Sequence, residues 1–176
     1  MNDRNIIFID SVHPVLEERL LQNGMKCINH TQSSFENLLP DLKNAYGIVI
    51  RSRFTIDPEF LAHCPKLQFI ARSGSGLENI DLKSCKERAI RVYNSPEGNR
   101  NAVAEHALGM LLSLLNNLNR ADQEIRSGIW KRDENRGEEL DGKTVGIIGY
   151  GNNGAAFAKK LRGFDVKVVA YDKYKT

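Results

Sequence analysis

The sequence contains little of what marks a secreted, membrane-spanning or metal-binding protein. Its three cysteines, Cys27, Cys64 and Cys85, are odd in number and far apart, so they match neither a disulfide framework nor a zinc pattern. No apolar run is long enough to span a membrane, and the opening residues MNDRNIIFID lack the apolar segment of a signal peptide. We therefore expect a cytoplasmic protein without a metal site.

An excess of charge of one sign is also missing. The 176 residues carry a net charge of +3, and the 25 basic and 22 acidic side chains are interspersed. Because a nucleic-acid-binding protein usually concentrates basic side chains on one face, we expect no nucleic-acid partner. Apolar residues make up 41% of the chain and charged residues 27%, which is typical of a soluble globular protein.

Short β-branched segments alternate with helical segments in the first part of the chain. We predict strands over residues 6–9, 26–28, 47–50, 67–71 and 90–93, and helices over residues 14–22, 34–43, 57–63 and 81–88. Ser34 and Asp81 are candidate helix N-caps. This alternation predicts right-handed crossovers and a parallel sheet with helices on both faces, as in a flavodoxin-like α/β domain with strand order 2-1-3-4-5.

The pattern changes after Asn94-Ser95-Pro96. Residues 102–125 predict one long helix, and its first half is apolar almost all round, as in a helix buried against a large surface or a second subunit. Residues 131–139 predict a charged, exposed loop, and a strand over 144–148, a helix over 155–164 and a strand over 167–171 follow. We expect a first domain over residues 1–97 and a second over residues 98–176.

A glycine motif, Gly149-Tyr150-Gly151-Asn152-Asn153-Gly154, stands between the strand and the helix of the last βαβ unit. This context is typical of the start of a Rossmann domain that binds a dinucleotide. Gly149 would allow a tight turn, and Gly151 would leave room for a pyrophosphate. Gly154 would let the helix pack close to the strand.

The second strand of that unit ends at Asp172, which can accept hydrogen bonds from the ribose hydroxyls of the cofactor. Its charge would repel a 2′-phosphate, so the sequence favours NAD over NADP. A P-loop is excluded because Ala155 stands where a lysine is required. The remaining alternative is a tight strand–helix turn without a ligand.

Polar turns follow two buried strands of the first domain, where parallel sheets bind ligands. Arg51 and Arg53 suit a carboxylate or phosphate, although solvated surface charge is an equal alternative. The segment 72–79 can expose successive backbone N–H groups as an anion nest, although an ordinary loop would have the same composition. His106 follows Glu105 on a helix, where adjacent residues do not face each other, so we expect a structural role for it.

Several motifs occur in a characteristic order: IVIRSR, KLQFIARSGSGLENIDL, NSPEGN, VAEHALGMLLSLLNN, IRSGIW and ELDGKTVGIIGYGNNG. Together they resemble the D-isomer-specific 2-hydroxyacid dehydrogenase family over nearly the whole chain, and most of all its members that oxidise 3-phospho-D-glycerate. The resemblance implies a small 2-hydroxy acid substrate, NAD as the cofactor, and a cleft between two domains. It also implies a homodimer or homotetramer built partly on the long helix.

The resemblance further implies roles for single residues in substrate binding. Arg51 would lie near the substrate phosphate, with Arg72 in the same region, while backbone groups of the serine–glycine loop would hold the carboxylate. Asn79 would support that loop. The implied substrate-binding set is Arg51, Arg72, Ser73, Gly74, Ser75, Gly76 and Asn79.

For the cofactor, the resemblance implies backbone contacts from Asn152 and Asn153 to the pyrophosphate and a ribose contact from Asp172. The family usually has Arg or Gln and then Ile or Met at these two asparagine positions, and backbone donation survives that change. The implied cofactor-binding set is Ser75, Gly149, Gly151, Asn152, Asn153, Gly154 and Asp172.

Catalysis in this family uses an arginine, a glutamate and a histidine from later Rossmann strands. A complete Rossmann domain needs about six strands, and this chain supplies two, so we expect no catalytic residue before Thr176. We interpret the chain as the inactive N-terminal portion of an enzyme that makes 3-phosphohydroxypyruvate for serine biosynthesis. Two alternatives remain: a reductase of hydroxypyruvate, glyoxylate or another 2-oxo acid, and a non-catalytic NAD-sensing protein of the same fold.

Overall fold

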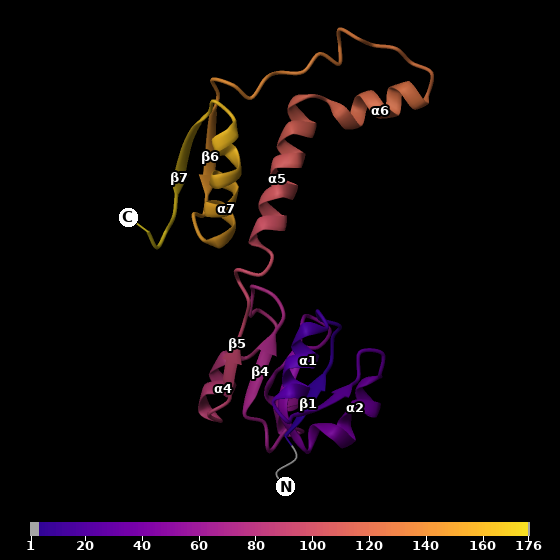
Figure 1. Cartoon of the computed structure of the whole chain (residues 1–176), viewed down its shortest axis with the longest axis vertical. Coiled ribbons are helices and arrows are strands. Elements are labelled where there is room, and N and C mark those ends of the chain that lie inside the picture. The colour runs from indigo at the N-terminus through magenta and orange to yellow at the C-terminus, as the bar shows by residue number, and fades with distance from the viewer. Residues whose placement is uncertain (1–3, 176) are drawn as a thin grey trace. The chain divides into compact units, whose positions relative to one another are not determined.

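The computed structural model describes residues 4–175, and the chain divides into two compact units, Met1–Pro96 and Glu97–Thr176. The first unit contains a parallel sheet with helices on both of its faces (Figure 1). The second contains three helices and a pair of strands.

The sheet of the first unit has the predicted flavodoxin-like topology. Its five strands are all parallel and lie in the order β2-β1-β3-β4-β5, which confirms the 2-1-3-4-5 prediction. The strands are β1 (Asn5–Phe8), β2 (Lys26–Asn29), β3 (Ala45–Ile50), β4 (Phe69–Arg72) and β5 (Arg91–Tyr93). The helices are α1 (Val15–Gln22), α2 (Phe35–Leu42), α3 (Pro58–Ala62) and α4 (Leu82–Glu87).

Capping side chains fix where three of these helices begin. Ser34 accepts a hydrogen bond from the N–H of Asn37 at the start of α2, and Asp81 accepts one from Ser84 at the start of α4, both as predicted. Asp57 caps α3 in the same way. Each cap provides an acceptor for an N–H group that has no partner within its helix.

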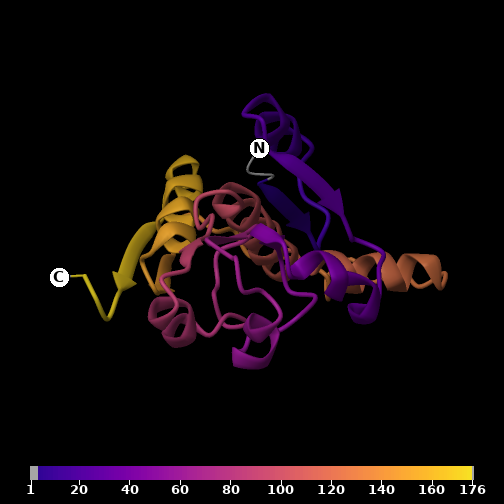
Figure 2. The ribbon, with the colours of Figure 1, turned by 90° about the horizontal axis from the view of Figure 1, so that it is seen from below.

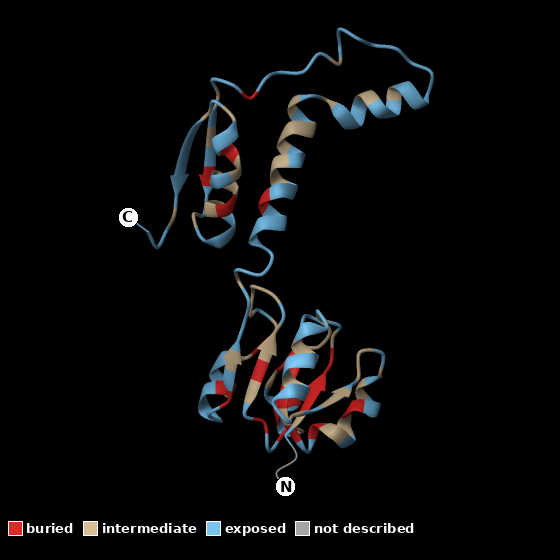
Figure 3. Ribbon diagram, viewed as in Figure 1, coloured by how far each residue is buried: buried red, intermediate tan, exposed pale blue. Residues whose placement is uncertain are grey.

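Successive side chains along the central strands point to opposite faces of the sheet, which divides the core of the first unit into two clusters. Ile7 and Ile9 point to the larger cluster, which α2, α3 and α4 cover, whereas Ile6 and Phe8 point to the smaller one beside α1. This two-sided burial is why the central strands are apolar throughout. Most of the buried residues lie in this unit, on its central strands and also on its helices and loops (Figure 3).

The second unit contains α5 (Arg100–Leu115), α6 (Leu118–Arg126), β6 (Thr144–Ile148), α7 (Asn152–Lys160) and β7 (Lys167–Tyr171). The strands β6 and β7 pair in parallel, and α5 packs against α7. Lys160 on α7 donates a hydrogen bond of 2.7 Å to Glu105 on α5. None of the helices within residues 4–175 is long and apolar enough to cross a membrane.

The prediction of one continuous helix over residues 102–125 was wrong. The helix ends after Leu115, and Asn117 adopts a left-handed conformation with φ 51° before α6 begins. Asparagine tolerates this conformation, and the side chain of Asn116 donates to the carbonyl of Leu112 at 3.0 Å. In both views α6 turns away from α5 (Figure 1 and Figure 2).

A second boundary also differs from its prediction. The helix expected from Ala155 begins at Asn152, inside the glycine motif, and its last turn is a 3-10 turn over Leu161–Gly163. The earlier start brings the N-terminus of α7 directly to Gly151, which precedes it.

Candidate functional site

The glycine motif forms the turn between β6 and α7, and two of its glycines are required by the backbone. Gly149 has φ 92°, a conformation that L side chains rarely adopt. A Cβ on Gly154 would lie 2.0 Å from the carbonyl oxygen of Gly149, so no side chain fits between α7 and the turn. At Gly151 a Cβ would meet no atom within 4 Å, so packing does not explain this glycine.

Asp172 follows β7 and is tied to the same turn. Its Oδ2 accepts a hydrogen bond of 2.7 Å from the N–H of Tyr150, and its Oδ1 accepts one of 2.9 Å from Tyr174. These bonds, first from Tyr174 and then from Tyr150, lower the pKa of Asp172 below its ordinary value of 3.8. The carboxylate is therefore ionised at neutral pH, and each oxygen keeps a lone pair for a further donor.

A cavity of about 500 Å³ opens beside the N-terminus of α7. Basic side chains and the unpaired N–H groups of the helix end meet there, a combination that attracts an anion. Lys175 also donates to the carbonyl of Tyr150 at 2.8 Å. The lining residues are Arg100, Asn101, Gly151, Asn152, Ala155, Ala156, Lys159 and Lys175.

The basic residues of this cavity were not predicted from the sequence. Arg100 comes from the start of α5, and only the packing of α5 on α7 brings it to the glycine turn. Lys159 could have been found, because it lies one helical turn after Ala155 on the same face of α7. Asn153 is exposed, so its polar side chain displaces no apolar packing.

At the carboxyl edge of the first unit, Asp10 organises the loop that follows β3. Its Oδ2 accepts hydrogen bonds from three successive backbone N–H groups, those of Arg51 at 2.6 Å, Ser52 at 3.1 Å and Arg53 at 3.3 Å. Asp10 was not predicted from the sequence, because it comes directly after the apolar segment of β1 and lies beside the loop only once the sheet has formed.

The two arginines of this loop have different environments. The Arg53 guanidinium donates to the carbonyls of Ile9 at 3.1 Å, His30 at 2.9 Å and Thr31 at 2.8 Å, and also to that of Ser33. Both terminal nitrogens of Arg53 therefore already donate within the unit. The Arg51 side chain is exposed and makes no hydrogen bond or ion pair with any residue in the described range 4–175.

Arg72, at the end of β4, is held in place by its neighbours. Its Nε donates to the carbonyl of Arg51 at 3.2 Å, and its Nη2 lies 3.7 Å from the carboxylate of Glu78. A Cβ on Gly74 would overlap the Arg72 guanidinium, and one on Gly76 would overlap the Glu78 carboxylate. Both glycines therefore make room for this ion pair.

The anion nest predicted for this loop forms only in part. The N–H of Ser73 donates to Ile50 at 2.8 Å and that of Gly74 to Arg72 at 2.9 Å, so neither is free for a ligand. Gly74 and Gly76 also lack the positive φ that alternates along a nest. Within residues 4–175, the N–H groups of Ser75 and Gly76 have no acceptor and remain available.

Asn79 connects this loop to residues 51–53, the loop that follows β3, which we call the Arg51 loop. Its Nδ2 donates to the carbonyl of Phe54 at 3.0 Å and to that of Arg51 at 3.3 Å. A cavity of about 270 Å³ lies beside Arg72. It is lined by Val12, His13, Val15, Leu16, Val49, Ala71, Arg72, Ser73, Tyr93, Asn94 and Ser95.

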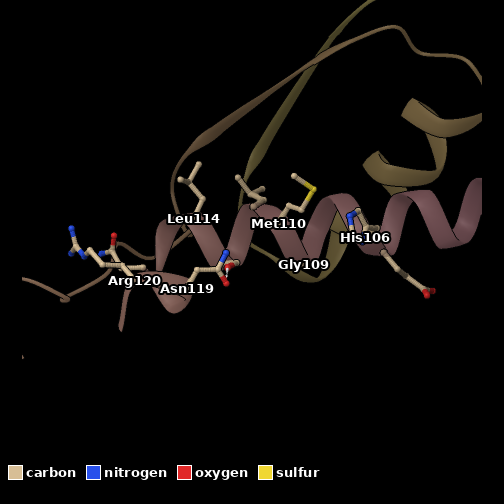
Figure 4. A pocket seen from close by; sticks show the side chains of 10 residues that line it. His106, Gly109, Met110, Leu114, Asn119 and Arg120 are labelled. Carbon is tan, nitrogen blue, oxygen red and sulfur yellow. Dashed lines mark hydrogen bonds between the residues drawn. The ribbon is translucent and has the colours of Figure 1, made fainter. Parts of the chain in front are cut away.

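A third cavity, of about 890 Å³, runs along α5 and α6 (Figure 4). It is lined by Glu105, His106, Gly109, Met110, Leu111, Ser113, Leu114, Asn117, Asn119 and Arg120. Glu105 pairs with Lys160, and His106 has no hydrogen bond to it. Met110 and Leu114 are 61% and 75% exposed, so the apolar side of α5 is uncovered in the described chain.

The predicted site residues thus form two groups. The substrate-binding set lies in the first unit along the carboxyl edge of the sheet, whereas the cofactor-binding set lies in the second unit, apart from Ser75. No group of His, Cys, Asp and Glu within residues 4–175 could hold a metal ion.

Comparisons with known proteins place the chain among the dehydrogenases. It is 32% identical to the D-3-phosphoglycerate dehydrogenase of Homo sapiens over 171 residues, which cover 97% of this chain and 32% of that protein. It is 40% identical to the enzyme of the same name from Mycobacterium tuberculosis over 139 residues, covering 79% of this chain and 26% of that protein. The chain therefore spans about a third or less of these relatives.

Solved structures agree in fold. The D-lactate dehydrogenase of Aquifex aeolicus, complexed with NAD and lactic acid, matches with a TM-score of 0.82 at 27% identity, over 98% of this chain and 52% of that one. The NAD-dependent formate dehydrogenase of Staphylococcus aureus, in complex with NAD, matches with a TM-score of 0.80 at 25% identity, over 97% and 56%. The model of the D-isomer specific 2-hydroxyacid dehydrogenase catalytic domain matches residues 6–172, and the chain belongs to that family.

Proposed function

We propose that this chain supplies the substrate-anion site and the first half of the NAD site of a dehydrogenase that oxidises 3-phospho-D-glycerate to 3-phosphohydroxypyruvate. The observation that carries the choice of substrate is the Arg51 guanidinium at the carboxyl edge of the sheet, which has no partner among residues 4–175. An unpaired arginine suits a phosphate through bidentate hydrogen bonds. The names of the curated relatives support the same substrate.

The glycine turn fits the adenosine side of NAD. The absent side chain at Gly151 leaves the N-terminus of α7 open to a pyrophosphate, and Asn152 and Asn153 would donate their backbone N–H groups to it. Asp172 would accept from the ribose hydroxyls, and its charge would disfavour the 2′-phosphate of NADP. NAD supplies the hydride acceptor when bound.

In the first unit, we assign Arg51 to the substrate phosphate and the N–H groups of Ser75 and Gly76 to the carboxylate. Arg72, Ser73 and Gly74 would then shape the loop, because the Nε of Arg72 and the backbone N–H groups of Ser73 and Gly74 already donate within the unit. The proposed acid–base group of the family, a histidine with a glutamate, is not assigned to any residue of this chain. We therefore expect the 176-residue chain to bind ligands without turnover.

Ligand titration tests these assignments. We expect Arg51→Ala to weaken binding of 3-phospho-D-glycerate by about tenfold or more, since hydrogen bonds to charged groups contribute about 1.5–3 kcal/mol. Arg19→Ala is the matched control, because Arg19 is an exposed arginine of the same unit on α1. D-glycerate, which lacks the phosphate, should bind both variants equally. Equal binding of 3-phospho-D-glycerate to both variants would refute the assignment.

The same titrations separate the alternatives. Tighter binding of hydroxypyruvate or glyoxylate than of 3-phospho-D-glycerate would favour a reductase of those acids. A non-catalytic NAD sensor would bind NAD through Asp172 and lose that binding in Asp172→Ala, yet it would bind no 2-hydroxy acid. The unchanged chain therefore distinguishes the substrate classes, and Asp172→Ala tests the cofactor site.

We also propose that the protein forms a homodimer or homotetramer through the uncovered side of α5 and α6. Met110, Leu114 and Leu118 are 61%, 75% and 54% exposed and lie along or beside the third cavity. Contiguous apolar exposure of this kind is rare on monomers. Sedimentation equilibrium of the chain and of Leu114→Glu measures the mass, and an unchanged monomeric mass for both would contradict the proposal.

A further inference from the structure

Both backbone groups of Arg51, its N–H and its carbonyl, are hydrogen-bonded, whereas its side chain has no partner among residues 4–175. The N–H of Arg51 donates to Asp10 at 2.6 Å, and its carbonyl accepts from Arg72 at 3.2 Å and from Asn79 at 3.3 Å. The next two N–H groups, of Ser52 and Arg53, also donate to Asp10.

We propose that Asp10 is a positioning residue of the anion site, acting on the ligand through the backbone of residues 51–53. One carboxylate oxygen, Oδ2, collects three consecutive N–H donors, which requires the loop to wrap around that oxygen. Charge-assisted hydrogen bonds of this kind are about twice as strong as neutral ones. This inference rests on the proposed role of Arg51 in binding the phosphate.

Arg53 completes the anchor from the other end of the loop. Its backbone N–H reaches Asp10, while its guanidinium reaches the carbonyls of residues at the ends of β1 and β2. The backbone of Arg51, directly after β3, is therefore held in place by hydrogen bonds to residues at the ends of β1 and β2. A side chain whose Cα is held in advance loses less freedom on binding a ligand than one on a mobile loop.

The negative charge of Asp10, taken alone, would weaken the binding of an anion rather than strengthen it. The negative carboxylate of Asp10 lies beside the Arg51 loop, so by Coulomb's law its removal should strengthen the binding of a phosphate. Positioning predicts that its removal weakens binding. The sign of the change therefore distinguishes the two effects, which makes substitutions of Asp10 informative.

Three substitutions separate geometry from charge. Asp10→Ala removes the acceptor, and we expect the Kd for 3-phospho-D-glycerate to rise about tenfold. Asp10→Asn keeps an oxygen acceptor without the charge, and we expect a Kd within about threefold of the unchanged chain. Asp10→Glu keeps the charge but displaces the oxygen by one methylene, and we expect it to weaken binding. Ser11→Ala, at the exposed neighbouring residue, is the control.

The amide signals of residues 51–53 in a ¹⁵N-labelled chain provide a readout that needs no ligand. We expect Asp10→Ala to move or broaden these three signals, and Asp10→Asn to restore them toward their original positions. If the signals of Asp10→Ala stay in place, or if it binds 3-phospho-D-glycerate as tightly as the unchanged chain, Asp10 does not position the loop.

Failure of this inference is distinguishable from failure of the proposed function. If Arg51→Ala weakens binding and Asp10→Ala does not, the anion site stands and the positioning role of Asp10 is overturned. If the unchanged chain and Arg51→Ala show the same affinity or no binding, the anion site itself fails and the inference fails with it. If Asp10→Ala does not fold, Asp10→Glu decides, and a Kd equal to that of the unchanged chain would overturn the inference.

Discussion

Replacing Gly154 by alanine tests the glycine turn most directly. The added Cβ would lie 2.0 Å from the carbonyl oxygen of Gly149 and 3.2 Å from Cγ2 of Ile147. The first neighbour is backbone and cannot rotate away, so α7 must move off the turn. Overpacking of this kind costs about 1–3 kcal/mol, while alanine recovers up to about 1 kcal/mol of helix propensity. We expect a net loss of about 1–2 kcal/mol in the free energy of unfolding of the second unit.

Thermal unfolding followed by circular dichroism measures this loss, since 1 kcal/mol shifts the midpoint of a 60–100-residue unit by about 4–8 °C. Amide exchange of β6 and β7 assigns the change to the second unit. Gly151→Ala is the matched control, because its Cβ would meet no atom within 4 Å and its φ is −79°. The control should fold normally and lose NAD binding. A Gly154→Ala chain that is as stable as the control would refute the close-packing explanation.

Three other predictions concern a residue with a left-handed backbone and two side chains whose pKa is shifted by the fold. Ala89 is exposed with φ 56°, so Ala89→Gly should raise the free energy of unfolding by about 0.5–1 kcal/mol in urea titrations, because left-handed residues other than glycine are strained. The hydrogen bond from the N–H of Ser84 lowers the pKa of Asp81 below 3.8. The cap therefore stabilises α4 fully above pH 3.8, and this contribution is lost as the pH falls through the lowered pKa. In urea titrations from pH 6 to pH 2, Asp81→Asn should abolish this acid-dependent loss of stability. Burial raises the pKa of Cys64 to about 12, so mass spectrometry after brief iodoacetamide treatment at pH 8 should find Cys27 alkylated and Cys64 intact.

Local pattern predicted the parallel sheet because its signals are short-range. Each strand of the first unit is a short segment with at least one β-branched residue, and each cap acts within three residues of its own position. The strand order followed from crossover rules rather than from any one residue. Boundaries moved by a few residues, as at β3, which begins at Ala45 rather than Gly47.

The break between α5 and α6 was missed because periodicity continues through it. Residues 102–125 keep a helical pattern, and two asparagines alone do not end a helix. In the structure, the N–H of Glu138 donates to the carbonyl of Leu115 at 3.0 Å, and the side chain of Asn117 donates to the carbonyl of Arg136. The loop that follows α6 thus returns to bind the end of α5. A contact across some twenty residues leaves no local trace in the sequence.

The two arginines of the Arg51 loop could not be distinguished from the sequence for the same reason. Arg51 and Arg53 are identical in type and two positions apart, and either could contact an anion. Arg53 is disfavoured only because carbonyls beyond the ends of β1 and β2 already accept from both of its terminal nitrogens, and those groups lie 20 to 44 residues earlier in the chain.

A motif therefore identifies which residues could bind an anion, and the folded chain decides which of them still have donors free. The glycines of the motif, in contrast, could be interpreted without knowledge of the rest of the fold. Gly149 and Gly154 were correctly interpreted from the motif, because the turn that requires them is built from the same few residues. Sequence reasoning is reliable where donor, acceptor and steric constraint are all local. It fails at Arg53, where the acceptors come from other strands of the sheet.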